Sequence, residues 1–190
     1  MEVASPQGWE SNQELVLDFY NKRRRQLLEV VPNSAHIQLA NLEKRYKVTI
    51  ITQNVDDLHE RAGSTNVIHL HGELLKVRSQ IAAEDIRLWN KDLVTGDLCS
   101  HGKQLRPHIV WFGEEVPMME KAINITAQAT TLIIIGTSMQ VYPAAGLLTY
   151  APKTIPIYFI DPKPAIASQK NLTVLAEKAT IGVEKVLKML

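Results

Sequence analysis

Short apolar runs alternate along this chain with segments in which apolar residues recur at helical spacing. The runs rich in β-branched residues predict strands at 48–52, 67–70, 132–135 and 155–160, and residues 105–112 are also expected to be extended. Helices are predicted from an S-x-x-E capping box at 11–14, from a break at 32–34, and over 117–129, 143–150 and 182–190. Strands that alternate with helices favour an α/β fold with a parallel, doubly wound sheet.

The segment 74–104 differs from the rest of the chain, because it is polar and irregular. Its one weak helical patch is predicted at 82–89. We therefore divide the chain into a main domain, made of residues 1–73 and 105–190, and a small inserted lobe, residues 74–104.

Composition excludes several classes of protein. Lys+Arg total 21 and Asp+Glu total 20, so the formal net charge of +1 does not favour binding to nucleic acid or to a membrane surface. The apolar runs are too short to span a bilayer. A single cysteine, Cys99, excludes an internal disulfide and any site that needs several thiolates, so we expect no metal and a reducing, cytoplasmic environment.

Polar residues follow three of the predicted strands. Thr52 to Asp56 follow one strand, Gly136 to Ser138 follow a second, and Asp161 follows a third. Because the carboxyl ends of parallel strands share one edge of a sheet, these groups could together bind a nucleotide. Any one of them alone is better explained as a turn or a cap, but the three together favour a site.

Two histidines, His69 and His71, lie at the end of another predicted strand and are followed by Gly72. A histidine in this position can act as a general base near neutral pH. The alternatives are a structural histidine with satisfied hydrogen bonds, or a metal pair, for which no further ligand stands at a convincing spacing.

Blocks of sequence resemble the Sir2, or sirtuin, family in the family's own order. Residues 52–73 contain TQNVDDLHERAG and HLHGE, which resemble the motifs T-Q-N-[IV]-D-x-L-H-x-x-A-G and H-x-H-G. RPHIVWFGE at 106–114 and GTSMQVYPAA at 136–145 resemble R-P-x-[IV]-V-x-F-G-E and G-T-S-x-x-V-x-P-A. The resemblance implies a Rossmann-like fold and an NAD-dependent deacylase of acylated-lysine proteins. In that family the acyl oxygen attacks the ribose as nicotinamide leaves, so NAD is consumed as a co-substrate.

The resemblance also implies a role for individual residues. His71 would be the catalytic base that acts on a ribose hydroxyl. The residues implied to bind NAD are Gln53, Asn54, Asp56, Gly136, Thr137, Ser138, Asp161 and Ala179. Asp161 stands where sirtuins often have asparagine, and a carboxylate still accepts hydrogen bonds from ribose. The residues implied to contact the peptide are Val110, Phe112, Gly113, Glu114 and Val141, with 110–114 pairing with the substrate backbone as an added strand.

A Tyr-x-x-Arg pair concerns the acyl group. Tyr20 and Arg23 are three residues apart and would share one helix face, and arginine is suited to holding a carboxylate. The pair resembles the one that marks the sirtuin branch acting on succinyl- and malonyl-lysine. The alternative is that residues 22–25 form a solvated basic face; the flanking sirtuin motifs favour the pair.

The sequence departs from the family in two places. Many sirtuins carry two Cys-x-x-Cys pairs that bind zinc, whereas Cys99 stands alone near His101, so we expect a zinc-free lobe. The family's first strand and its G-A-G-[IM]-S phosphate loop have no match, so we expect the first βα unit to be absent and NAD binding to be weak. The alternative function is an inactive sirtuin-like interaction or sensor module. A generic nucleotide-binding domain would explain neither His71-Gly72 nor Tyr20 and Arg23.

Overall fold

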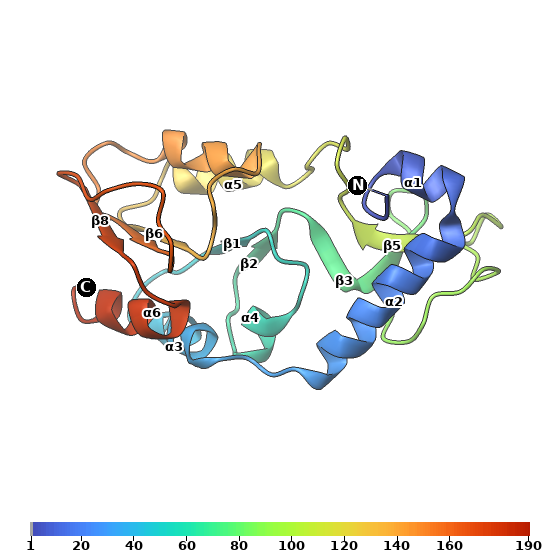
Figure 1. Ribbon diagram of the computed structural model, residues 1–190, viewed down its shortest axis with the longest axis horizontal. Helices are drawn as coiled ribbons and strands as arrows, with labels where there is room; N and C mark the ends of the chain where they lie inside the picture. The colour runs from blue at the N-terminus through green and yellow to red at the C-terminus, as the bar shows by residue number, and fades with distance from the viewer. Residues whose placement is uncertain (1) are drawn as a thin grey trace. The chain divides into compact units, whose positions relative to one another are not determined.

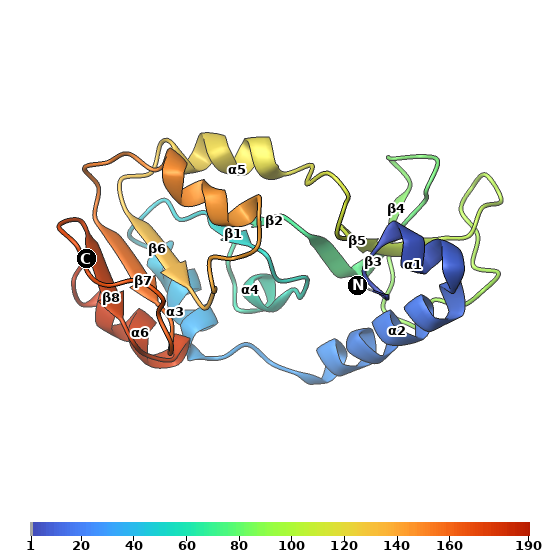
Figure 2. The ribbon, with the colours of Figure 1, turned by 45° about the horizontal axis from the view of Figure 1, so that its top comes forward.

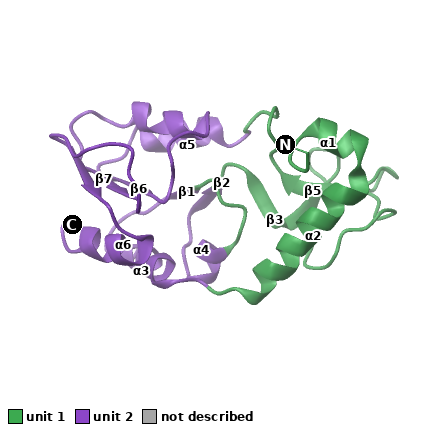
Figure 3. Cartoon of the chain, in the orientation of Figure 1, with its two compact units in different colours: residues 1–31, 52–57, 69–116 green, residues 32–51, 58–68, 117–190 purple. Residues whose placement is uncertain are grey.

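The computed structural model describes residues 2–190, which form two compact units (Figure 3). Of the described residues, unit 1 contains 2–31, 52–57 and 69–116. Unit 2 contains residues 32–51, 58–68 and 117–190. Each unit is therefore assembled from three separate stretches of the chain.

Unit 1 packs two helices against an antiparallel sheet (Figure 1). The helices are α1 (Pro6–Ser11) and α2 (Gln13–Glu29). The sheet has the order β4-β3-β5, formed by β4 (Ile86–Leu88), β3 (Gly72–Arg78) and β5 (Arg106–Ile109). Helix α2 contacts both β3 and β5. The buried apolar side chains of this unit include Trp9, Val16, Leu17, Leu70, Leu74, Val77, Leu105, Ile109 and Trp111.

The helical patch predicted at 82–89 is wrong, because residues 86–88 form strand β4. Ile86 and Leu88 alternate with Arg87, which is the period of a strand, and Arg78 of β3 pairs with Ile86. The amide of Ser79 donates to the carbonyl of Asp85 at 3.0 Å and closes the connection. The division of the chain into a main domain and a lobe at 74–104 stays a prediction; within unit 1, β3 pairs with β5 and α2 packs on both strands.

The capping box predicted at 11–14 is also wrong. Ser11 ends α1, and Asn12 is the residue that caps α2, since its side chain accepts from the amide of Leu15 at 3.0 Å. Helix α1 was not predicted from the pattern: Ser5 accepts from the amide of Gly8 at 3.1 Å, and Pro6 occupies the first turn.

Unit 2 contains a parallel sheet with the order β6-β7-β8 (Figure 2). Its strands are β6 (Leu132–Ile135), β7 (Ile157–Ile160) and β8 (Leu172–Leu175). The predicted strand at 132–135 is confirmed residue for residue, and that at 155–160 is confirmed with a later start. The sequence pattern gave no signal for β8. The helical elements of this unit are α3 (Ser34–Leu42), α4 (Leu58–Arg61), α5 (Met119–Thr126), the 3-10 helix η1 (Ala144–Tyr150) and α6 (Ala179–Leu187).

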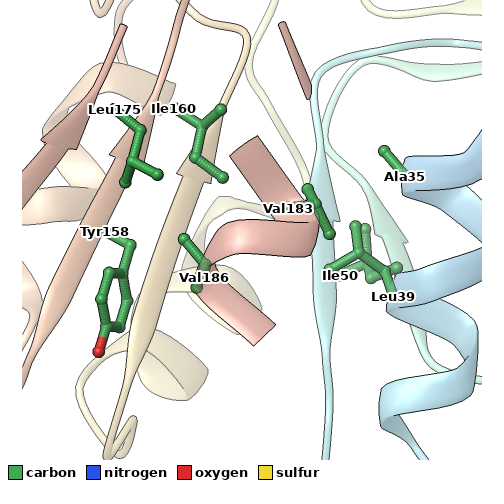
Figure 4. Close-up of a cluster of buried hydrophobic side chains, with 8 residues drawn as sticks. All are labelled: Ala35, Leu39, Ile50, Tyr158, Ile160, Leu175, Val183 and Val186. Atoms are coloured by element: carbon green, nitrogen blue, oxygen red, sulfur yellow. The ribbon is translucent and has the colours of Figure 1, made fainter. Parts of the chain in front are cut away.

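The core of unit 2 lies between this sheet and two helices, α3 and α6, which contact each other (Figure 4). The two helices and three strands share one cluster of buried side chains: Ala35, Leu39, Ile50, Tyr158, Ile160, Leu175, Val183 and Val186. Gly182 lets α6 approach β7 closely, because a Cβ there would lie only 2.3 Å from Cγ2 of Ile160. Helix α6 is thereby held against the strand that ends at Ile160.

Strands β1 (Ile50–Thr52) and β2 (Val67–His69) form a separate two-stranded sheet. The amide of Ile50 donates to Asn66 and the amide of Leu70 donates to Thr52, both at 2.9 Å, so the partners advance in the same direction and the strands run parallel. The predicted parallel arrangement is therefore present in two separate sheets, and the third sheet is antiparallel. Among residues 2–190, no helix is long and apolar enough to cross a membrane.

Candidate active site

In unit 1, the loop that follows β1 contacts the side chain of His71. Nδ1 of His71 lies 3.1 Å from the carbonyl oxygen of Gln53. The backbone on either side is also fixed, because the amide of Leu70 donates to Thr52 and the amide of Val110 donates to the carbonyl of His71, both at 2.9 Å. His71 is half-buried, so the protein surrounds the residue without enclosing it.

This contact determines which nitrogen of His71 is available for chemistry. A carbonyl oxygen can only accept, so Nδ1 of His71 must carry the proton that is donated to Gln53. In a neutral ring the other nitrogen, Nε2, then has a free lone pair. His71 is therefore held in the tautomer in which Nε2 can accept a proton from a bound molecule.

Gly72 brings β3 close to β5 directly after the histidine. Its φ angle is +83°, and a Cβ at this position would lie 2.1 Å from the carbonyl oxygen of His108. A residue with a side chain would therefore be strained twice, by its backbone conformation and by contact with His108. The sequence H-G is required here by the geometry of the strands.

The residues predicted to bind NAD in unit 1 lie on the same loop. The amide of Asn54 donates to Oγ1 of Thr52 at 3.0 Å, and the carbonyl of Asn54 lies 3.3 Å from Nδ1 of His69. Gln53 and Asp56 are half-buried and Asn54 is exposed. The structure therefore brings Gln53 and Asn54 beside the two histidines, through backbone carbonyls that sequence motifs do not reveal.

The segment 110–114 forms a turn and is not an extended strand. Strand β5 ends at Ile109, and the amide of Glu114 donates to the carbonyl of Trp111 at 3.0 Å. The extended segment predicted to run to Phe112 therefore ends at Ile109. The amides of Val110 and Phe112 already donate to His71 and Ala4. The side chain of Phe112 is 59% exposed, which leaves it accessible to a ligand.

A partly buried polar cluster holds this turn in place. The carboxylate of Glu114 accepts from Arg106 at 2.6 and 3.0 Å, from Arg78 at 3.2 Å and from the amide of Trp111 at 2.7 Å. The guanidinium carbon of Arg106 lies 3.3 Å from the centroid of the Trp111 ring. Burial would raise the pKa of Glu114, but the bonds from Arg106 and Trp111 and the nearby arginine charges lower it overall.

Tyr20 and Arg23 lie in different environments. Tyr20 is buried, and its hydroxyl accepts from Nε1 of Trp111 at 3.0 Å. Arg23 is exposed, and its guanidinium carbon lies 5.5 Å from the centroid of the Phe19 ring. Burial raises the pKa of Tyr20, while the Trp111 bond and the charges of Arg106 and Arg23 act against that rise.

The neighbours of Arg23 in the basic run have protein partners. Lys22 pairs with Asp18 at 2.6 Å and Arg25 pairs with Asp92 at 2.7 Å. Arg24 is buried and donates to the carbonyl of Leu74 and to Asn21. Arg23 makes no hydrogen bond or ion pair with any residue in 2–190, so its charge can meet a ligand.

In unit 2, two of the predicted nucleotide-binding positions come together at the carboxyl edge of the parallel sheet. Ile135 of β6 pairs with Ile160 of β7, and the amide of Gly136 donates to the carbonyl of Ile160 at 2.8 Å. Gly136 and Asp161 therefore start adjacent loops. Gly136 has a φ angle of +61°, and the carboxylate of Asp161 accepts from the amide of Lys163 at 2.7 Å.

The remaining predicted residues of unit 2 lie on neighbouring loops and on α6. Oγ1 of Thr137 accepts from the amide of Met139 at 3.2 Å, and Ser138 is exposed. Val141 is 39% exposed and its carbonyl accepts from Ala145 at 2.8 Å. Ala179 is the first residue of α6 and packs against the core of the unit. Ala179 therefore has a structural contact that its sequence position did not indicate.

Among residues 2–190, no group of three or more histidine, cysteine, aspartate or glutamate side chains is arranged to hold a metal ion. Cys99 is buried as a free thiol, and its amide donates to the carbonyl of Lys103 at 2.7 Å. Sequence reasoning missed Trp111 and Arg106 as site residues, although both lie in the R-P-x-[IV]-V-x-F-G-E block. The signal that could have found them is the pairing of an arginine with an aromatic residue and a glutamate within nine positions.

Comparison with known proteins agrees with this arrangement. The Sir2 family profile matches residues 1–143. An NAD-dependent protein deacylase of Helicobacter pylori is 57% identical over 188 residues, which cover 98% of this chain and 82% of that protein. A second NAD-dependent protein deacylase, from Bacteroides thetaiotaomicron, is 48% identical over 196 residues, covering 100% of this chain and 84% of its own length.

Solved structures show the same fold. A Sir2 homolog–NAD complex matches with a TM-score of 0.88 at 34% identity, covering 99% of this chain and 76% of that one. A Sir2 bound to acetylated peptide matches with a TM-score of 0.84 at 26% identity, covering 99% and 83%. The Rossmann-like α/β prediction is confirmed, and the chain belongs to the Sir2 family and is an enzyme of that family.

Proposed function

We propose that this sirtuin is an NAD-dependent protein-lysine deacylase in which His71 is the general base. The observation that carries the proposal is the contact between Nδ1 of His71 and the carbonyl of Gln53, which leaves Nε2 free to accept a proton. General bases placed in this way contribute about 10²- to 10⁴-fold to a rate. The names of the Helicobacter and Bacteroides relatives support the same activity.

The residues present fit NAD as a co-substrate. Gly136, with its positive φ, and the carboxylate of Asp161 begin adjacent loops at the edge of a parallel sheet, which is where such sheets bind nucleotides. Thr137, Ser138 and Ala179 would contribute from the same unit. The resemblance to sirtuins also assigns a role in NAD binding to Gln53, Asn54 and Asp56 of unit 1. When bound, NAD supplies the ribose carbon to which the acyl oxygen is transferred and the nicotinamide that leaves. His71 would take the proton of a ribose hydroxyl.

We further propose that the enzyme prefers acyl groups that end in a carboxylate, such as succinyl and malonyl. Arg23 supports this preference, because its charge is exposed and has no anionic partner within residues 2–190. Its charge also acts on Tyr20, so the two groups are electrostatic neighbours. A phenol that stays protonated and a guanidinium suit a carboxylate ligand. Val110, Phe112, Gly113 and Val141 would contact the acylated peptide.

The single cysteine supports a further proposal, that the small lobe holds no structural zinc. A tag-free sample should contain far less than one zinc per chain by metal analysis. One zinc per chain that survives treatment with a chelator would contradict it.

The activity is tested by measuring nicotinamide release with succinyl-lysine and acetyl-lysine peptides for the wild type, His71→Ala and Arg23→Met. His71→Ala should lose at least about 100-fold in turnover with both peptides. Arg23→Met should lower the specificity constant for the succinyl peptide, relative to the acetyl peptide, by about ten- to a hundredfold, since bonds to charged groups contribute about 1.5–3 kcal/mol.

Arg25→Met is the matched control for Arg23→Met, because Arg25 is also exposed but is paired with Asp92. An equal loss with both peptides in Arg23→Met would contradict the acyl preference and leave a general role for that residue. Full activity in His71→Ala would remove it from the mechanism. Nicotinamide release that, with either acylated peptide, does not exceed the rate without enzyme would favour the alternative, an inactive interaction or sensor module.

A further inference from the structure

Trp111 contacts Tyr20 through a hydrogen bond in which the hydroxyl proton of Tyr20 is not donated. The indole Nε1 can only donate, so the 3.0 Å bond makes the Tyr20 oxygen the acceptor. Tyr20 makes no second hydrogen bond with any residue in 2–190. The phenol proton is therefore directed away from Trp111 and has no acceptor among residues 2–190.

The indole is itself fixed from several sides. The guanidinium of Arg106 stacks on its ring at 3.3 Å, and the ring of Trp9 lies 5.8 Å away at an interplanar angle of 40°. The backbone amide of Trp111 donates to Glu114 at 2.7 Å. Glu114 also holds Arg106 through two bonds, a fork-to-fork arrangement that sets the plane of the guanidinium.

These contacts form one connected series within unit 1. Glu114 fixes Arg106, Arg106 fixes the Trp111 ring, and Trp111 fixes the Tyr20 hydroxyl. All but Glu114 are buried, and hydrogen bonds polarise one another in such surroundings. A phenol that accepts from an indole becomes a better donor through its own proton. A donor that is already oriented loses less freedom when a ligand binds.

We propose that Trp111 is a positioning residue for acyl selectivity: its indole N–H orients the Tyr20 hydroxyl so that the phenol proton is presented to the distal carboxylate of the acyl group. This inference rests on the proposed preference for acidic acyl groups, and it assigns to Trp111 a role that acts only through Tyr20. Trp111 does not touch the substrate in this role.

The first experiment examines the contact without any turnover. The chain has three tryptophans, and their indole N–H groups have different partners: none within residues 2–190 for Trp9, the Asp92 carbonyl for Trp89 and the Tyr20 hydroxyl for Trp111. Their NMR signals are assigned by the loss of one signal in Trp9→Phe and of another in Trp111→Phe. Tyr20→Phe should shift the Trp111 signal upfield. If that signal does not move, the hydrogen bond is not formed and the inference fails.

The second experiment is a double-mutant cycle on acyl selectivity. KM and kcat are measured with succinyl- and acetyl-lysine peptides for Trp111→Phe, Tyr20→Phe and the double variant. Trp111→Phe should raise the KM for the succinyl peptide, relative to the acetyl peptide, by about three- to tenfold, the range of one neutral hydrogen bond. In the Tyr20→Phe background the same substitution should change the ratio by less than about twofold, because there is no hydroxyl left to orient.

Trp9→Phe is the matched control, because it also removes one buried indole N–H but one without a partner in the described chain. It should leave the ratio of the two KM values unchanged. Equal effects of Trp111→Phe with and without the Tyr20 hydroxyl would overturn the inference. If Arg23→Met fails to change the ratio, the acyl preference itself fails; if Arg23→Met changes it and Trp111→Phe does not, only the role of Trp111 fails.

Discussion

At the scale of single residues, the basic run at 22–25 shows what a motif predicts and what it leaves out. The pattern Tyr-x-x-Arg identified Tyr20 and Arg23, whereas the alternative, a solvated basic face at 22–25, would place Arg24 and Arg25 in the same environment. In the structure Arg24 is 1% exposed, and burial lowers its pKa to about 10. One position along a helix rotates a side chain by about 100°, which takes it from solvent to the core.

Arg24→Met should therefore destabilise the protein, whereas Arg25→Met should not. Removing Arg24 takes away the side-chain donor to the carbonyl of Leu74 and one of the two donors to the side-chain oxygen of Asn21, which keeps its bond from the amide of Leu93. We expect a loss of about 1–3 kcal/mol in the free energy of unfolding, measured in urea. Arg25 belongs to an exposed pair with Asp92, and its loss should change stability by less than about 1 kcal/mol. If Arg24→Met is as stable as the wild type, removing the cost of burying a charge outweighs the loss of the hydrogen bonds.

At the scale of elements, apolar periodicity predicted the central strands better than the small lobe. Strand β6 was predictable because four aliphatic residues stand together and Gly136 follows. Strand β8, with its half-exposed Leu172 and exposed Thr173, carries too weak a pattern. Strand β4 has three residues and is fixed by its pairing with β3, which is a tertiary contact that no local window contains. The contacts of His71 with the Gln53 carbonyl could not be predicted for the same reason.

The H-G motif belongs to this scale, because Gly72 determines how closely β3 approaches β5. Gly72→Ala should lower the free energy of unfolding by at least about 3 kcal/mol or prevent folding, since the strain of a positive φ, about 1–3 kcal/mol, is increased by the contact with the His108 carbonyl. Gly96→Ala is the control: its φ is +98°, but a Cβ there meets nothing within 4 Å. Denaturation in urea compares the two. Equal losses would show that the strand contact contributes nothing.

At the scale of the whole molecule, acidic side chains with lowered pKa values make the fold sensitive to acid. Hydrogen bonds from Arg87 and Ser100 lower the pKa of Asp85 to about 2, and the pKa of Glu114 also lies below its ordinary value. In the unfolded chain these groups take up a proton at their ordinary pKa. As the pH falls below about 4.5, the unfolded chain therefore binds more protons than the folded protein, and stability decreases.

Glu114 should account for a measurable part of this decrease, because it joins Arg78 of β3, Arg106 of β5 and the turn at Trp111. At neutral pH, Glu114→Gln should cost about 3 kcal/mol, since it leaves the buried Arg106 without its anion. As the pH falls below 4.5 and then below the lowered pKa of Glu114, the wild type loses the same interaction, so the difference between the two proteins should shrink. Urea unfolding at a series of pH values measures this convergence.

Glu115→Gln, a substitution of the exposed neighbour, is the control. Its free energy of unfolding, plotted against pH, should run parallel to that of the wild type. A Glu114→Gln curve that also stays parallel would mean that Glu114 does not carry its charge in the folded protein, and the cluster that holds Trp111 would then need another anion.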